Sequence, residues 1–128
     1  MRKSGILMHI SSLSSPYGIG TMGQTARQFV DFLKEGGQQC WQLLPICPTS
    51  YGDSPYQSFS SFAGNPYFID LDLLIKDGLL TKDEIKSCDF GSDSAKIDYE
   101  KLYNNRYHLF KIAFSRFKSD SNYDTFIE

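Results

Sequence analysis

The chain has 128 residues, 41% of them hydrophobic and 22% charged, which are ordinary globular values and exclude wholesale disorder. Thirteen Lys and Arg residues against 15 Asp and Glu residues give a net charge of -2, so we expect no nucleic-acid partner. No apolar run approaches the roughly 18 residues of a membrane span. The apolar stretch after the basic start is also too short for a signal peptide. We therefore expect a cytoplasmic protein that does not bind membranes.

The first elements predict an α/β protein. Residues 5–10 are apolar except for His9, which is typical of a strand buried on both faces of a parallel sheet. Residues 11–23 are too rich in Ser, Pro and Gly to be anything but a loop. Helical spacing of apolar residues predicts a helix over 25–35, and two glycines, 36–37, end it.

Residues 40–44 predict a second short strand, which Pro45 stops. Strand, helix and strand in this order form a βαβ unit with parallel strands and a right-handed crossover. One such unit cannot cover both faces of a parallel sheet. We therefore expect further units after residue 128 or from another chain.

The second half of the chain predicts mostly helices. Residues 68–71 are a short extended candidate, followed by a helical turn over 72–76 that Gly78 closes. Thr81 to Glu84 is a capping box that opens a short helix. Asp98 can cap a long helix from Tyr99 to about Lys118, and residues 123–128 predict the start of another. The apolar positions of the long helix are Leu102, Leu109, Phe110, Ala113, Phe114 and Phe117.

Residues 18–23 match Gly-x-Gly-x-x-Gly between a strand and a helix, which in dinucleotide-binding enzymes brings the backbone close to a pyrophosphate. Two features count against this function. Seven residues separate the strand from the first glycine, and no acidic residue follows the second strand to hold a ribose hydroxyl. The alternative is a glycine-rich turn that folds the loop back, with Thr21 near the helix start.

No metal site or nucleophile motif is predicted. The two histidines, His9 and His108, are far apart, and the three cysteines lack C-x-x-C spacing, so we expect free thiols. The sequence around Ser54 fails as a nucleophile elbow because Pro55 follows it and removes the usual oxyanion donor.

The long loop over residues 46–65 is the strongest candidate binding feature, since loops of this length are usually functional. It carries Tyr51, Asp53, Ser54 and Tyr56 after the second strand, where flat rings beside hydroxyls and a carboxylate suit a carbohydrate. The alternative is a self-packed Ω-loop whose tyrosines cover the sheet end. His9, at the end of the first strand, is a further candidate because α/β sites lie at the carboxyl ends of strands.

Five motifs in sequence order closely resemble the opening of the 4-alpha-glucanotransferases, also called amylomaltases or disproportionating enzymes. They are GILMHISSL (5–13), SPYGIG (15–20), WQLLP (41–45), YGDSPYQSFS (51–60) and AGNP (63–66). The resemblance covers most of residues 5–74. Two departures are Ser14, where the family often has Pro, and Thr21, where it often has Asp; Thr can still cap a helix.

The resemblance implies the N-terminal portion of a TIM (β/α)8 barrel of the alpha-amylase clan, incomplete in this chain. All of residues 1–128 would belong to the catalytic barrel, as its first strands and helices, a substrate-binding loop and a helical insertion. The implied reaction moves an α-1,4-glucan segment to the 4-hydroxyl of an acceptor glucan or glucose by a retaining mechanism. Its partners would be maltooligosaccharides and starch or glycogen chains, and no metal or organic cofactor takes part.

The resemblance also assigns residues. Tyr56 matches a tyrosine that lines the donor site, Ser54 and Asp53 match its neighbours, and Tyr51 matches an aromatic of a second glucan-binding groove. The three catalytic carboxylates of the family lie in later strands, so we expect none before residue 128 and an inactive isolated chain. The alternatives are a non-catalytic glucan-binding segment and, less favoured, a dinucleotide-binding α/β enzyme.

Overall fold

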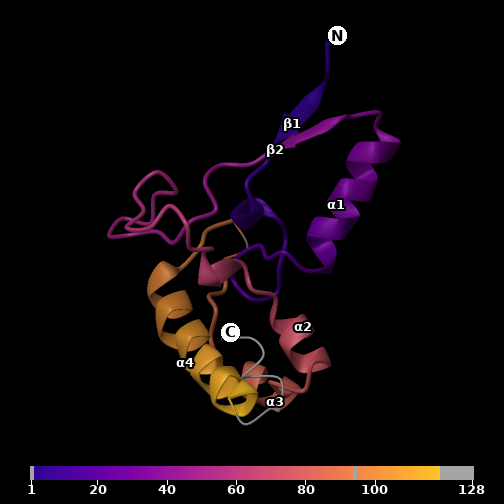
Figure 1. Cartoon of the computed structure of the whole chain (residues 1–128). Helices are drawn as coiled ribbons and strands as arrows, with labels where there is room; N and C mark the ends of the chain where they lie inside the picture. The colour runs from indigo at the N-terminus through magenta and orange to yellow at the C-terminus, as the bar shows by residue number, and fades with distance from the viewer. Residues whose placement is uncertain (1, 94, 119–128) are drawn as a thin grey trace. The chain divides into compact units, whose positions relative to one another are not determined.

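The structure is a computed structural model that describes residues 2–93 and 95–118 (Figure 1). The chain divides into two compact units, Met1–Asp70 and Leu71–Glu128, which are described in turn. The helix predicted over residues 123–128 lies outside the described residues.

The first unit is built on a parallel strand pair joined through a helix. Strand β1 (Gly5–Leu7) pairs with β2 (Cys40–Gln42), with Gly5 opposite Cys40, and helix α1 (Gln24–Glu35) lies between them in sequence (Figure 1). The predicted parallel βαβ order is therefore confirmed, whereas the handedness of the crossover stays a prediction. The pairing continues one step, because the Met8 amide donates to the Gln42 carbonyl over 3.1 Å.

The two strands are shorter and more exposed than the sequence predicts. All three residues of β1 are exposed, including Ile6 at 40% and Leu7 at 57%, so burial on both faces is wrong for the described chain. The apolar run also leaves the strand early, because a 3-10 helix, η1 (Ile10–Ser12), begins with His9 as its N-cap. An apolar run shows that its side chains favour burial, but burial also needs neighbouring elements. The described sheet has only two strands, which do not supply that cover.

Helix α1 ends as predicted but begins differently. Gly36 is its C-cap, and Gly37 follows with a φ of +68°, a left-handed conformation that favours glycine. Its N-cap is Gly23, so Thr21 lies near the helix start, as expected, but does not cap the helix. The buried Thr21 hydroxyl instead donates to Asp70 Oδ2 over 2.5 Å and joins positions 49 residues apart.

The segment between β1 and α1 contributes core residues, which its Ser, Pro and Gly content did not predict. The buried apolar residues of the first unit are Ile10, Leu13, Ile19, Ala26, Leu33, Tyr67 and Phe68. Three of these come from residues 10–19. The short turns of that segment therefore do more than connect β1 to α1, because they bury apolar side chains themselves.

The second unit holds three helices, α2 (Leu71–Lys76), α3 (Lys82–Lys86) and α4 (Tyr99–Phe117). The capping box is confirmed: Thr81 and Glu84 exchange side-chain to backbone hydrogen bonds. The Asp98 cap is confirmed as well, since its carboxylate accepts from the Lys101 amide over 3.1 Å.

The prediction of an extended segment at residues 68–71 is wrong. Its first residue belongs to a 3-10 helix, η2 (Pro66–Phe68), and its last residue, Leu71, begins α2. The Asn65 side chain caps η2, and Pro66 stands at its first position, where a missing N–H costs nothing.

The buried face of α4 follows the predicted spacing with one exchange. Leu102, Leu109 and Ala113 are buried as expected, but Phe114 is 55% exposed. Arg106 is completely buried, with its guanidinium carbon 5.5 Å from the centre of the Phe110 ring. A long aliphatic stem and a cation over an aromatic face let arginine occupy a position that an apolar pattern assigns to other residues.

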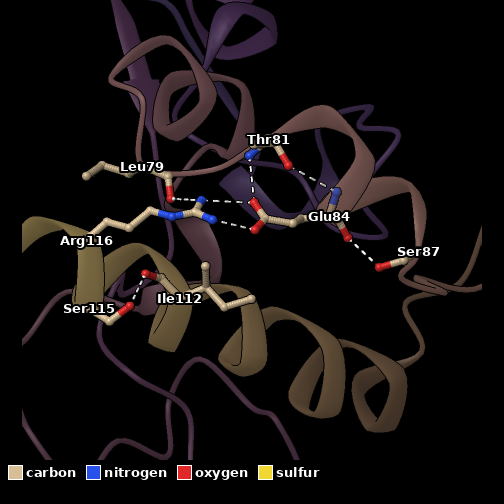
Figure 2. Close-up of polar contacts among 7 residues, drawn as sticks. All are labelled: Leu79, Thr81, Glu84, Ser87, Ile112, Ser115 and Arg116. Carbon is tan, nitrogen blue, oxygen red and sulfur yellow. Dashed lines mark hydrogen bonds and ion pairs between the residues drawn. The ribbon is translucent and has the colours of Figure 1, made fainter.

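A two-pronged ion pair joins α4 to α3 (Figure 2). Arg116 Nη2 lies 2.6 Å from Glu84 Oε1, and Nη1 donates to both Glu84 Oε2 and the Leu79 carbonyl. The Arg116 hydrogen bonds, followed by the Thr81 amide, lower the pKa of the Glu84 carboxyl from 4.5 to about 2. Glu84 therefore caps the N-terminus of its own helix and also binds α4 through Arg116.

We expect the Glu84 carboxyl to titrate near pH 2, because protonation must give up the Arg116 pair. The stabilising contribution of the pair is present above pH 4.5 and is lost as the pH falls through about 2. A carbon-13 NMR titration of the full-length protein carrying this segment measures the pKa directly. Arg116→Met should raise it toward 4.5, whereas Lys86→Met, which removes a neighbouring exposed cation, should not. An unchanged pKa in Arg116→Met would contradict the assignment.

Candidate functional site

Both candidate binding elements leave the same edge of the β1–β2 pair. Because the strands are parallel, their carboxyl ends lie together, with Leu7 opposite Gln42. His9 follows β1 by two residues, and the long loop over 46–65 follows β2 (Figure 1). The Trp41 indole N–H donates to the Met8 carbonyl over 2.7 Å and ties the two strand ends together.

His9 lies half-buried at this edge, beyond the strand rather than in it. Its ring meets the Phe68 ring edge-on, with centroids 5.3 Å apart and planes at 82°. Burial lowers the pKa of the imidazole below 6.5, so the ring is neutral at neutral pH. Within the described chain, its Nδ1 atom is buried and has no hydrogen-bond partner. A neutral imidazole has one donor and one acceptor nitrogen, which suits hydrogen bonding to a neutral hydroxyl.

The long loop is closed at its base. The Asn65 amide donates to the Ile46 carbonyl over 2.8 Å, and the Cys47 thiol contacts the Ser61 carbonyl at 3.6 Å. Between these points the loop has no helix or strand, as predicted. A chain that leaves and returns at one point is an Ω-type loop, as the alternative hypothesis expected.

Hydrogen bonds within the loop define the turn that carries Asp53, Ser54 and Tyr56. The Ser50 amide donates to the Gln57 carbonyl over 2.8 Å, and the Asp53 amide donates back to the Ser50 carbonyl. Asp53 has a φ of 54°, in the left-handed region that Asp tolerates better than most residues. The Ser54 hydroxyl accepts from the Tyr56 amide over 3.3 Å. Asp53 and Ser54 therefore shape the backbone on which Tyr56 stands.

The aromatic rings of the loop point to solvent rather than inward. Tyr51 is 100% exposed, Tyr56 71% and Phe59 75%, so the tyrosines do not cover the sheet end in the described chain. Phe62 is also fully exposed and was not among the predicted site residues. The signal that could have found it is a pair of phenylalanines, Phe59 and Phe62, in a serine-rich stretch of the loop.

The glycine motif at residues 18–23 is used for close packing inside the first unit. A Cβ on Gly20 would collide with the Ile10 carbonyl and lie 2.8 Å from the Leu13 carbonyl. A Cβ on Gly23 would overlap the Asp70 carboxylate. The Asp70 side chain therefore already occupies the space at the start of α1, which leaves no place for a pyrophosphate. The glycine-rich turn is the alternative that the geometry favours.

The described residues offer neither a metal-binding cluster nor a membrane-spanning helix. Among residues 2–93 and 95–118, no group of three or more His, Cys, Asp or Glu side chains could hold a metal ion. No helix in that part of the chain is long and apolar enough to cross a bilayer. Cys40, Cys47 and Cys88 are free thiols, as predicted.

Comparison with known proteins assigns the family. A family model described as 4-alpha-glucanotransferase matches residues 8–128. The chain belongs to the 4-alpha-glucanotransferase family. The resemblance seen in the sequence motifs is thereby confirmed.

Individual relatives agree with the family match but are much longer. The chain is 57% identical over 116 residues to a 4-alpha-glucanotransferase of Streptococcus pneumoniae, covering 91% of this chain and 23% of the relative. It is 51% identical over 123 residues to a 4-alpha-glucanotransferase of Clostridium butyricum, covering 94% of this chain and 25% of that protein. The chain spans about a quarter of the length of the curated relatives it matches.

A solved structure shows the same fold over this stretch. The amylomaltase from Streptococcus agalactiae in complex with acarbose superposes with a TM-score of 0.94 at 45% sequence identity. The match covers 98% of this chain and 26% of that chain. The fold of this stretch therefore occurs within an amylomaltase.

Gly20→Ala tests whether the glycine motif serves packing. The added methyl group must displace backbone at residues 10 and 13, so we expect a loss of about 1–3 kcal/mol in unfolding free energy. Gly64→Ala is the matched control, because a Cβ there meets nothing within 4 Å. Urea unfolding of the full-length protein measures both variants. Equal stability of the two variants would count against close packing at Gly20.

Proposed function

We propose that this chain is the N-terminal part of the (β/α)8 barrel of a 4-alpha-glucanotransferase, with residues 1–128 all belonging to the catalytic barrel. The protein that contains it transfers α-1,4-glucan segments to the 4-hydroxyl of an acceptor glucan or glucose, with retention of configuration at the anomeric carbon. Membership of the family and the fold shared with an amylomaltase support this proposal.

The observation that carries the proposal is the presentation of Tyr51 and Tyr56. Their rings are exposed on a loop whose backbone is held by its own hydrogen bonds, at the carboxyl end of a parallel strand pair. Barrel enzymes build their sites at that end of the strands. A glucose unit offers an apolar C–H face and a rim of hydroxyls, which match the face and the hydroxyl of a tyrosine.

Each predicted site residue has a distinct role in this proposal. Tyr56 lies against a donor glucose unit and bonds a sugar oxygen, and Tyr51 stacks on a glucan chain in a second groove. Ser54 and Asp53 hold the turn and offer further polar atoms to the sugar. His9, neutral at neutral pH, exchanges a hydrogen bond with a sugar hydroxyl. These roles need no metal and no organic cofactor.

The reacting groups lie elsewhere in the protein. A retaining reaction needs a carboxylate nucleophile and a second carboxyl group that acts as acid and then base. We propose that these come from strands beyond residue 128, so the chain supplies substrate contacts only. The substrates are maltooligosaccharides and starch or glycogen chains, in the cytoplasm, with no nucleic-acid or membrane partner.

Replacement of Tyr56 tests the donor-site role in the full-length protein. Tyr56→Phe keeps the ring and removes one hydrogen bond of about 0.5–1.5 kcal/mol, so kcat/KM on maltotriose should fall by up to about tenfold. Tyr56→Ala removes the ring as well and should lose distinctly more. The melting temperature should hardly change, because the ring is already 71% exposed.

The control for Tyr56→Ala is Phe32→Ala, which removes an exposed ring from α1, outside the loop. It should retain parental kcat/KM. If Tyr56→Ala instead keeps parental kinetics on maltotriose, the donor-site role is wrong.

The isolated 128-residue chain should not disproportionate maltotriose, because no covalent glycosyl-enzyme can form without the carboxylate pair. Incubation should leave maltotriose unchanged relative to a sample without protein, as read by chromatography of the sugars. Glucose and longer maltodextrins above that background would overturn the expectation. A different result would favour the alternative of a non-catalytic glucan-binding segment. In that case the isolated chain binds maltooligosaccharides without turnover, and its open reading frame does not continue into a longer protein.

A further inference from the structure

Asn65 stands where the long loop rejoins the folded part of the first unit. It is only 7% exposed, which is unusual for an amide side chain. Its backbone amide donates to the Ile46 carbonyl over 2.8 Å and closes the base of the loop. Its side-chain Oδ1 accepts from the Tyr67 amide over 3.0 Å and caps η2. One residue therefore binds the start of the loop with its backbone and the anchor after the loop with its side chain.

The helix after the loop, η2, is well packed and contacts His9. Tyr67 and Phe68 of η2 are each 6% exposed, and the Phe68 ring meets the His9 ring edge-on at 5.3 Å. The Asn65 cap thus fixes the helical turn that supports His9. The same residue fixes the point from which the loop carrying Tyr56 departs.

Other holds on the loop lie near its base, where Pro48 is buried and the Cys47 thiol contacts the Ser61 carbonyl. Farther out, Tyr51, Tyr56, Phe59 and Phe62 are all exposed and add little burial. The hydrogen bonds around Ser50 and Gln57 define the shape of the turn but not its place on the protein. Its placement relative to His9 therefore depends on its base, where the Asn65 amide bonds Ile46 and the Asn65 side chain bonds the start of η2.

We propose that Asn65 is a positioning residue for glucan binding: its side-chain cap on η2 holds the loop of Tyr56 and the ring of His9 in one frame. This rests on the proposed function. Without the cap, the base of the loop opens in part of the population, and the apparent affinity for the glucan falls by the fraction that stays closed. The effect reaches the substrate through Tyr56 and His9 and not through contact with Asn65.

Kinetics of the full-length protein on maltotriose test this. Asn65→Ala should raise KM about five- to tenfold, the effect of a lost N-cap on a local equilibrium, with kcat within about threefold of the parent. Asn65→Asp keeps an acceptor oxygen in the same place and should restore KM to within about threefold. The matched control is Asn104→Ala, at an exposed position on α4, which should leave both constants unchanged.

A double variant separates positioning from general damage. In the Tyr56→Ala background, Asn65→Ala should cost less in kcat/KM than it costs the parent, because the contact of Tyr56 is already lost. If the two losses multiply, or if Asn65→Ala and Asn65→Asp are equally impaired, the proposal is wrong. Unchanged kinetics in Asn65→Ala would overturn it as well.

Limited proteolysis gives a readout that does not depend on activity. Chymotrypsin cuts after aromatic residues, and the loop presents four exposed ones. Cleavage within residues 51–62 should be at least about fivefold faster in Asn65→Ala than in Asn65→Asp or the parent. If Asn65→Ala does not fold, Asn65→Gln takes its place, because the longer side chain cannot hold its oxygen at the N-cap position. Equal cleavage rates in Asn65→Ala and the parent would overturn the proposal. If Asn65→Ala is cleaved faster but the parent protein has no transferase activity, only the proposed function is overturned.

Discussion

Parallel pairing of β1 with β2 is the constraint on which the candidate site depends. Antiparallel strands would send His9 and the aromatic loop to opposite ends of the sheet. The parallel register, with Leu7 beside Gln42, brings both to one edge. Two contacts from Met8 reinforce that register: its amide donates to the Gln42 carbonyl and its carbonyl accepts the Trp41 indole. The strands are short, so these contacts at their ends carry much of the pairing.

In the long loop, the groups that define the backbone conformation differ from the side chains that are exposed to a ligand. Backbone and serine hydrogen bonds define the turns, and none of them involves an aromatic ring. The exposed rings therefore contribute little to folding and remain available for a ligand with a flat apolar face. Substitutions in the rings should change binding, whereas substitutions at the base of the loop should change where the rings stand.

Local signals in the sequence predicted the elements that local interactions create. The glycines at 36–37 end α1, and Thr81 with Glu84 forms a capping box, because each signal depends on residues within one turn. Non-local interactions were missed. The partner of Thr21 lies 49 residues away, so its capping role could not be excluded from the sequence. Arg106 is buried with its guanidinium over the Phe110 ring on the next turn, and an apolar pattern does not predict such a cation–π contact.

Strand burial and the candidate site differ in how far the sequence could reach. Apolar composition predicted strands covered on both faces, but coverage depends on neighbouring strands that a short segment does not determine. The order of motifs was enough to place Tyr51, Asp53, Ser54 and Tyr56 on one loop and to place that loop after a strand. It could not reveal that Asn65 links the loop to η2, because an Asn-Pro pair is compatible with many turns. The link becomes visible only when the acceptor at Ile46 and the donor at Tyr67 are both located.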